Sequence, residues 1–269
     1  MDSEMAEETP QETDSPGTTT EFELPVGGAT LRAAVQLPAG RTTLTQLLPI
    51  LQGIENTIVD RVSMEAQAAG RPISCRAGCG ACCRQLVPLS IFEAEALTQW
   101  LQTLPEDRLA ALRQRFHLAL SALRDAGVMN RILDGSWMTD EKTNTRLNID
   151  YFHAGVPCPF LEDESCSIHP IRPLSCREYL VTSSPELCKD PAAHAIAGLD
   201  IPVRFSRTLF AFGRHIEQDA RGWIPLVFLL AWGSSGAQPG DHVTGTGPDL
   251  LRLFLDQVQA QSEHAEKEA

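Results

Sequence analysis

The sequence predicts a mainly α-helical protein whose helices pack around an irregular, proline- and cysteine-rich metal-binding loop region. Three observations indicate this fold class. Apolar residues recur at helical spacing on both sides of the centre of the chain. All eight cysteines lie between residues 75 and 188, and four prolines lie between Cys158 and Cys188, which excludes long helices there. With 43% apolar residues, the 269-residue chain can bury a core without depending on a metal alone.

The charge of the chain is unevenly distributed. Residues 1–31 contain eight acidic residues and no Lys or Arg, so they carry most of the formal net charge of −13. Because this stretch is also poor in large apolar residues, we expect a disordered acidic tail over residues 1–31. A single helical domain over residues 41–261, with the cysteine cluster at 70–190, and a frayed C-terminus at 262–269 complete the expected organisation. No basic stripe indicates a nucleic-acid partner.

Helical periodicity predicts most of the elements. The first expected helix lies within residues 43–69, where Leu44, Leu47, Leu51 and Ile54 share one face. A capping box, Ser90 to Glu93, predicts that the second begins at residue 91 and continues through Leu101. The other expected helices cover residues 106–126, 205–216 and 250–261. Residues 127–157 have no clean period, so no element is predicted there.

No segment has the features of a membrane or export signal. The acidic N-terminus lacks the positive and apolar regions of a secretory signal. The longest apolar run, residues 223–232, has half of the roughly 20 residues that a membrane span needs, so we expect a buried core segment instead. A soluble cytoplasmic protein is the expectation. In the reducing cytosol, clustered cysteines bind metal more often than they form disulfides.

The cysteines form a tight quartet and a loose quartet. The tight quartet is Cys75, Cys79, Cys82 and Cys83, spaced C-x3-C-x2-C-C, and the loose quartet is Cys158, Cys166, Cys176 and Cys188, spaced C-x7-C-x9-C-x11-C. Closely packed thiolates repel one another unless a cation neutralises them, so this pattern predicts one or two metal sites. Eight thiolates could hold two tetrahedral zinc ions, and an iron–sulfur cluster also uses thiolate ligands. The adjacent Cys82 and Cys83 are awkward ligands for one ion, which favours a cluster or two metals.

Cationic residues stand beside the cysteines in the sequence. Arg84, Arg172 and Arg177 are candidates to compensate the negative charge of a thiolate site and to donate hydrogen bonds to sulfur. His169, close to Cys166, is expected to lie near the metal ligands rather than to be one of them, because thiolates are already in excess.

The cysteine segments resemble a known family. SCRAGCGACCRQL, CPFL and CSIHPIRPLSCREY, followed by Cys188, are similar to the YkgJ-type cysteine-cluster family of zinc- or iron-chelating domains over roughly residues 70–190. The resemblance implies that all eight cysteines bind metal at one or two sites. This family is in turn similar to flagellin lysine N-methylases through its cysteine cluster, which raises methyl transfer from S-adenosylmethionine as an alternative.

Two functions from different classes therefore stay open. The excess of metal ligands over catalytic residues favours a metal-binding protein that coordinates iron, as an iron–sulfur cluster, or zinc. The alternative is a metal-cluster-dependent enzyme such as a protein lysine N-methylase, although no glycine-rich nucleotide loop follows a predicted strand. A thiol switch is a third reading, and it needs one cysteine that binds no metal. The sequence leaves catalytic residues and any protein partner unidentified.

Overall fold

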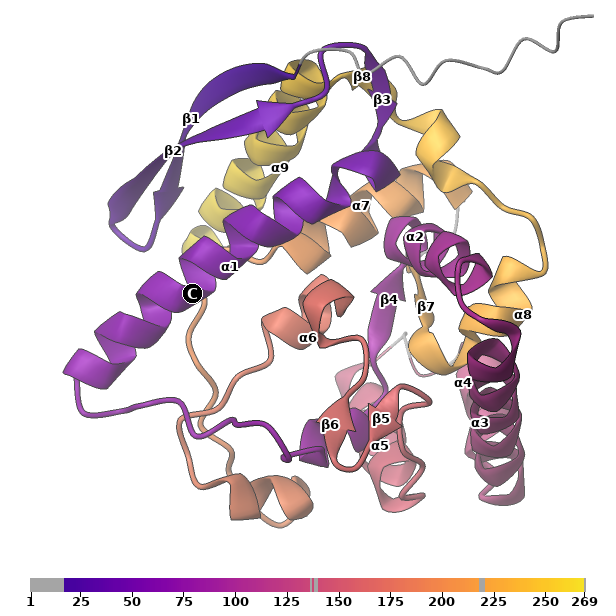
Figure 1. Ribbon diagram of the computed structural model, residues 1–269. Coiled ribbons are helices and arrows are strands. Elements are labelled where there is room, and N and C mark those ends of the chain that lie inside the picture. Colours follow the sequence, from indigo (N-terminus) through magenta and orange to yellow (C-terminus); the bar gives the residue numbers. More distant parts are fainter. Residues whose placement is uncertain (1–16, 136, 138–139, 218–220, 269) are drawn as a thin grey trace, which may run out of the picture.

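The computed structural model describes residues 17–135, 137, 140–217 and 221–268. In this part of the chain, α-helices predominate and the strands form small two-stranded sheets (Figure 1). The predicted mainly α class is therefore confirmed. The long helices are α1 (Leu44–Ala68), α2 (Ile91–Gln102), α3 (Glu106–Asp125), α5 (Glu141–His153), α7 (Phe205–Glu217) and α9 (Gly247–Glu268).

The N-terminal region differs from the prediction. Residues 18–31 lie in an antiparallel hairpin of β1 (Thr18–Val26) and β2 (Ala29–Leu37), not in a disordered tail, while residues 1–16 of the predicted tail lie outside the described residues. Gly27 and Gly28 connect the strands at positive φ, the conformation that a tight hairpin turn requires. Leu24, Val26 and Leu37 are buried against the helices. Polar composition hid this alternation of apolar residues.

The first and last helices pack together through the main apolar core. Thr43 and Gln46 form a capping box at the start of α1, and β3 (Arg41–Thr43) pairs with β8 (Thr244–Thr246) just before α9. Phe205 of α7 and Phe254 of α9 are fully buried, with ring centroids 5.1 Å apart. Helix α9 continues to Glu268, past residue 261, where we expected fraying to begin.

The second predicted helix begins where its capping box indicates. The Ser90 hydroxyl accepts from the Glu93 N–H, and the Glu93 carboxylate accepts from the Ser90 N–H. Helix α3 also lies where predicted. Two helices in residues 127–157, α4 (Val128–Asp134) and α5, were missed because each buries only a few apolar residues and their periods are correspondingly weak.

The apolar run at residues 223–232 forms several short core elements. It folds as β7 (Trp223–Pro225), η5 (Leu226–Phe228) and most of α8 (Leu229–Gly233), and β7 pairs with β4 (Pro88–Ser90). Among the described residues, no helix is long and apolar enough to span a membrane. The run therefore packs inside the fold, as the sequence predicted.

The cysteines lie in short elements and in the segments between them. These elements cluster below α1 in Figure 1, between that helix and the lower end of the molecule. They are η1 (Ala81–Arg84), β5 (Leu161–Glu162), β6 (Ser165–Cys166), η3 (His169–Ile171), α6 (Leu174–Arg177) and η4 (Pro185–Lys189), with η6 (Pro239–His242) elsewhere in the chain.

Candidate metal centre

The tight quartet is held at its start by the segment after α6. The Ser74 N–H donates to the Val181 carbonyl at 2.9 Å, and the Ser74 hydroxyl donates to the Ser183 carbonyl at 2.6 Å. In return, the Val181 N–H donates to Cys75 Sγ at 3.4 Å. An N–H directed at sulfur stabilises a thiolate. The first cysteine is thus positioned by residues more than 100 positions away in the sequence.

The β5–β6 hairpin packs against the turn of the tight quartet. A Cβ added at Gly80 would lie 2.6 Å from Glu164 Oε2 and 2.8 Å from a Leu161 methyl carbon, so a larger residue would displace these two side chains. Arg84 donates to both carboxylate oxygens of Glu164, at 2.7 and 3.0 Å, and to the Gly80 carbonyl. The Cys158 N–H donates to the Cys83 carbonyl at 2.7 Å. These contacts join the two quartets.

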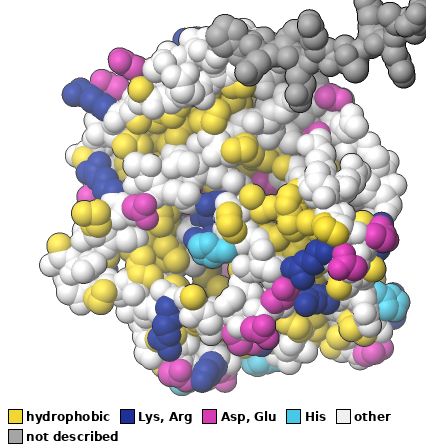
Figure 2. Space-filling model, viewed as in Figure 1, with side chains coloured by type: hydrophobic (Ala, Val, Ile, Leu, Met, Phe, Trp, Pro, Cys, Tyr) yellow, Lys and Arg dark blue, Asp and Glu magenta, His cyan; other side chains and the backbone are white. Residues whose placement is uncertain are grey.

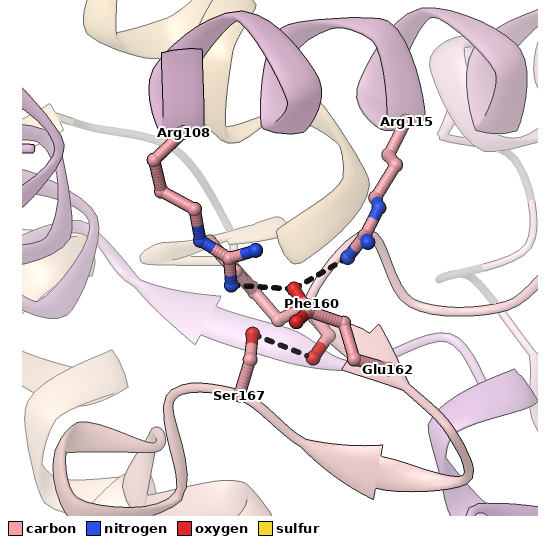
Figure 3. A network of polar contacts seen from close by, with 5 residues as sticks. All are labelled: Arg108, Arg115, Phe160, Glu162 and Ser167. Atoms are coloured by element: carbon pink, nitrogen blue, oxygen red, sulfur yellow. Dashed lines mark hydrogen bonds and ion pairs between the residues drawn. The ribbon is translucent and has the colours of Figure 1, made fainter. Parts of the chain in front are cut away.

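A carboxylate on β5 ties the same hairpin to helix α3 (Figure 3). Glu162 accepts from Arg108 and from Arg115, each at 2.5 Å. Both Arg108 and Arg115 are on α3, whose Leu112 and Phe116 belong to the apolar cluster against which Cys158 and Cys166 pack. On the other side of the hairpin, the Ser167 hydroxyl and N–H both donate to the Phe160 carbonyl at 2.9 Å. The segment from Cys158 to Cys166 is thereby fixed to the helical framework.

Arg177 holds the segment between Cys166 and Cys176 against α1. Its guanidinium donates to the carbonyls of Pro170 and Arg172, at 2.6 and 3.0 Å, and to Asn56 and Gln52 of α1, at 2.9 and 3.2 Å. The residue is only 5% exposed. We predicted that Arg177 would donate to sulfur. Its recorded hydrogen bonds instead go to backbone and α1, although its charge still interacts with Cys176.

Cys82 interacts with most of the other thiols. Its sulfur is close enough to interact with the charges of six others, namely Cys75, Cys83, Cys158, Cys166, Cys176 and Cys188. In one group, Cys75, Cys79 and Cys188 also interact with one another. In a second group, Cys176 and Cys158 interact with each other and each interacts with Cys83 and Cys166. Both groups therefore draw cysteines from each sequence quartet, and none of the eight is in a disulfide.

Burial and mutual repulsion keep most of these thiols protonated. Burial is the main cause that raises the pKa of Cys75, Cys166, Cys176 and Cys188, and it raises the pKa of Cys158 to about 12. Cys82 is the exception. The hydrogen bond from the Cys83 thiol lowers the pKa of Cys82 to about 7, and the same bond raises that of Cys83. Cys82 is thus the thiol that loses its proton most readily.

Arg172 is the predicted cation that faces the sulfurs. Its charge opposes the burial that raises the pKa of Cys75 and Cys166, and it helps the Cys83 hydrogen bond to lower that of Cys82. The Arg172 Nε–H is buried and has no hydrogen-bond acceptor in the described part of the chain. A buried donor without an acceptor costs about 1–3 kcal/mol. A metal-bound thiolate or sulfide would accept this hydrogen bond, so the surroundings fit such a group.

The other two predicted neighbours of the site are only indirectly connected to it. Arg84 interacts with the charge of Cys83, but its hydrogen bonds go to Glu164 and Gly80. His169 is exposed and contacts Arg172, and burial together with the charges of Arg172 and Arg177 lowers its pKa. No cysteine is among its recorded contacts.

Two residues near the sulfurs were missed in the sequence. Tyr179 interacts with Cys188, Cys82 and Cys75, and its hydroxyl accepts from Gln85 at 3.0 Å. Glu93 of the α2 capping box also accepts from the Leu174 N–H, at 2.6 Å, and its charge interacts with Cys176. The sequence signal for Tyr179 was its place in the motif Cys176-Arg177-Glu178-Tyr179. Nothing local predicted the second contact of Glu93.

The donors fit a thiolate metal site in kind, but they are not arranged around one point. In the described residues, no group of three or more His, Cys, Asp or Glu side chains is positioned to hold a metal ion. The sulfurs lie within range of charge interaction with one another, but no three of them are grouped closely enough to hold an ion. Any metal bound here would therefore require the sulfurs to move closer together.

Comparisons with known proteins bear on the cysteine region alone. No curated protein and no solved structure that was searched matches the chain. Residues 74–194, slightly less than half of the chain and containing all eight cysteines, match the family CxxCxxCC, described as a "putative zinc- or iron-chelating domain".

Proposed function

We propose that the protein binds zinc or iron at two adjacent four-thiolate sites. One site consists of Cys75, Cys79, Cys82 and Cys188, and the other consists of Cys83, Cys158, Cys166 and Cys176. The observation that carries this proposal is the division of the charge interactions among the thiols into two sets, Cys75, Cys79 and Cys188 in one and Cys83, Cys158, Cys166 and Cys176 in the other. Cys82 interacts with both sets and completes the first set to four ligands. The match to a zinc- or iron-chelating domain supports the class of metal.

The adjacent cysteines are the boundary between the two sites. Side chains of neighbouring residues project in different directions, so Cys82 and Cys83 can each serve a different metal. Four thiolates suit zinc or the irons of a cluster, because soft sulfur ligands select these metals over magnesium or calcium. The Nε–H of Arg172 has no acceptor among the described residues, which supports an anionic group next to this side chain.

Metal binding must also bring the sulfurs closer and release their protons. Most of the thiols have raised pKa values, so a cation has to displace those protons. The segments that carry Cys158 to Cys188 consist of short elements, which can shift by small amounts more easily than long helices. We therefore expect metal to tighten this region and to leave the long helices nearly unchanged.

The first test is the composition of the protein purified without oxygen. Iron, zinc and acid-labile sulfide are measured together with the visible spectrum. A colourless protein with about two zinc ions per chain supports two zinc sites, and a brown protein with sulfide supports iron–sulfur clusters. A chain that acquires neither metal, even when it is refolded with excess metal, would contradict the function.

The second test asks which cysteines share a site. In Cys79→Ser/Cys188→Ser, both changes fall in one proposed site, so about half of the metal is retained. In Cys79→Ser/Cys176→Ser, one change falls in each site, so nearly all metal is lost. The two variants have the same number of serines and differ only in grouping. Equal metal loss in both would rule out this division of the ligands.

A further inference from the structure

A cavity of about 700 Å³ opens beside the tight quartet. Pockets for small molecules typically measure roughly 300–1,000 Å³, so its size suits a small ligand. Four segments of the chain line it: the tight-quartet turn, the end of α5, the β5–β6 turn and η4. Its lining residues include Arg76, Cys79, Phe152, His153, Glu164 and Lys189.

Cys79 connects this cavity to the other cysteines. All eight cysteines lie in the described part of the chain, and Cys79 alone lines the cavity. The Cys79 sulfur in turn interacts with those of Cys75 and Cys188. The cavity is therefore the side from which a small molecule can approach the sulfur cluster.

The charges on the cavity wall are paired except at one position. Arg84 pairs with Glu164 at 2.7 Å, Lys189 pairs with Glu186, and His153 lies 3.7 Å from Asp190. Arg76 is exposed and forms no ion pair at bonding distance with a described residue, although its charge contributes to lowering the pKa of Glu186. Figure 2 shows basic and acidic side chains close together along the lower part of the molecule. Arg76, three residues from Cys79, is thus a cation available to a ligand.

We propose that this cavity binds a small molecule that carries carboxylates and can hold a metal ion. Its carboxylate contacts the Arg76 guanidinium, which offers two parallel donors to such a group. The buried ring of Phe152 contributes an apolar wall. This placement brings a metal carrier to the one thiol that the cavity exposes. The role as an entry point for metal rests on the proposed function, whereas carboxylate binding at Arg76 does not.

Calorimetry on the full-length protein tests the site with two probes, citrate and glutathione. Both carry carboxylates, and they distinguish a polycarboxylate from a thiol peptide as the source of the ligand. We expect at least one to bind, and we expect Arg76→Glu to weaken that binding about tenfold or more, because reversing the charge replaces attraction with repulsion. Arg113→Glu is the matched control. Arg113 is exposed on α3, pairs with Glu106, and does not line the cavity.

The outcomes separate the cavity from the metal function. Binding of a probe that Arg76→Glu weakens and Arg113→Glu preserves supports the site, and restoration by Arg76→Lys strengthens that support. Failure of both probes, or equal loss in the two Glu variants, overturns it. Metal content is measured on every sample. Wild-type protein that takes up no metal but still binds citrate through Arg76 would contradict the metal sites and leave the carboxylate site standing.

Discussion

The helical core and the cysteine region are ordered by different kinds of contact. In the core, long helices and the β1–β2 hairpin bury large apolar side chains such as Leu47, Leu51, Phe205 and Phe254 almost completely. In the cysteine region, short elements are held by individual polar groups, such as Arg177 on backbone carbonyls and Glu162 on two arginines. Figure 1 shows the long helices α1, α7 and α9 packed together and the short elements below them.

This difference determines how each region responds to change. Apolar burial is non-directional and shared among many neighbours, so the core is stable without any one polar contact. A clamp such as Arg177 has few substitutes, because one buried guanidinium holds four acceptors and all of them would lose this donor together. We therefore expect core substitutions to affect the whole protein and clamp substitutions to affect the positions of the cysteines.

The largest effect is expected from Phe254→Ala. Phe254 is fully buried and packs against Phe205 and Phe212, so its loss leaves a cavity in the main core. The free energy of unfolding should fall by about 3–5 kcal/mol, measured by urea denaturation followed by circular dichroism. The adjacent Leu253 is 49% exposed, so Leu253→Ala is the control and should cost much less. Similar losses in the two variants would mean that this core is not the main source of stability.

Arg177→Met should have the next largest effect. The change keeps an unbranched side-chain stem and removes four hydrogen bonds, leaving Asn56, Gln52 and two carbonyls without this donor. We expect a loss of about 2–3 kcal/mol. Hydrogen exchange should also accelerate more in residues 166–177 than in the long helices, α1 included. Arg61→Met is the control, because Arg61 forms only an exposed pair with Glu65 on the same helix. Uniform faster exchange over the whole chain would argue against a local clamp.

Glu55→Gln tests the contact between the helical core and the cysteine region, because Glu55 of α1 interacts with Glu178, the residue after α6. Glu55 of α1 is fully buried, and both of its carboxylate oxygens lack a hydrogen-bond partner among the described residues. Burial, followed by repulsion from Glu178, raises its pKa to about 9. Because the folded pKa lies above the unfolded value, the wild type is stabilised by this group below about pH 4.5 and loses that contribution as pH rises toward 9.

The variant should therefore be more stable than the wild type at high pH. At pH 8 we expect a gain on the order of 2 kcal/mol, and at pH 5 little difference, from chemical denaturation at both pH values. Glu65→Gln, an exposed change on the same helix, should not show this pH dependence. If wild type and Glu55→Gln lose stability in parallel between pH 5 and 8, Glu55 ionises without penalty.

The smallest effect is expected from Glu162→Gln. The ion pairs of Glu162 with Arg108 and Arg115 are partly exposed, so solvent screens them and the change should cost about 0.5–1 kcal/mol at pH 7. Hydrogen bonding to Arg108 is the largest cause that lowers the pKa of Glu162. This stabilisation is present above the unfolded pKa and is lost as pH falls through the lower folded value.

The difference from wild type should consequently shrink below about pH 4.5, measured by thermal unfolding across that range. Glu106→Gln removes a more exposed pair with Arg113 and is the control. A constant difference at all pH values would assign the effect of Glu162→Gln to packing.

The sequence predicted those parts of the fold that depend on neighbouring residues. The helices α1, α2, α3 and α7 follow from apolar spacing and from local caps, such as Ser90 with Glu93, which act within one or two turns. The β1–β2 hairpin also had a local signal, two glycines between alternating strands, but an acidic composition concealed it. Helices α4 and α5 lacked a strong period and were found only in the structure.

Residue types in the cysteine region predict its chemistry, whereas the contacts between its groups follow from the packing of the whole chain. Cysteine content and spacing predict thiolate ligands because that choice of donor is a property of residue type. The spacing could not predict that Cys188 would lie with Cys75 and Cys79, or that Cys83 would lie with Cys158 and Cys176. Nor could it assign Arg172 to the sulfurs and Arg177 to α1. These are contacts between distant segments, and their geometry depends on how the helices between those segments pack.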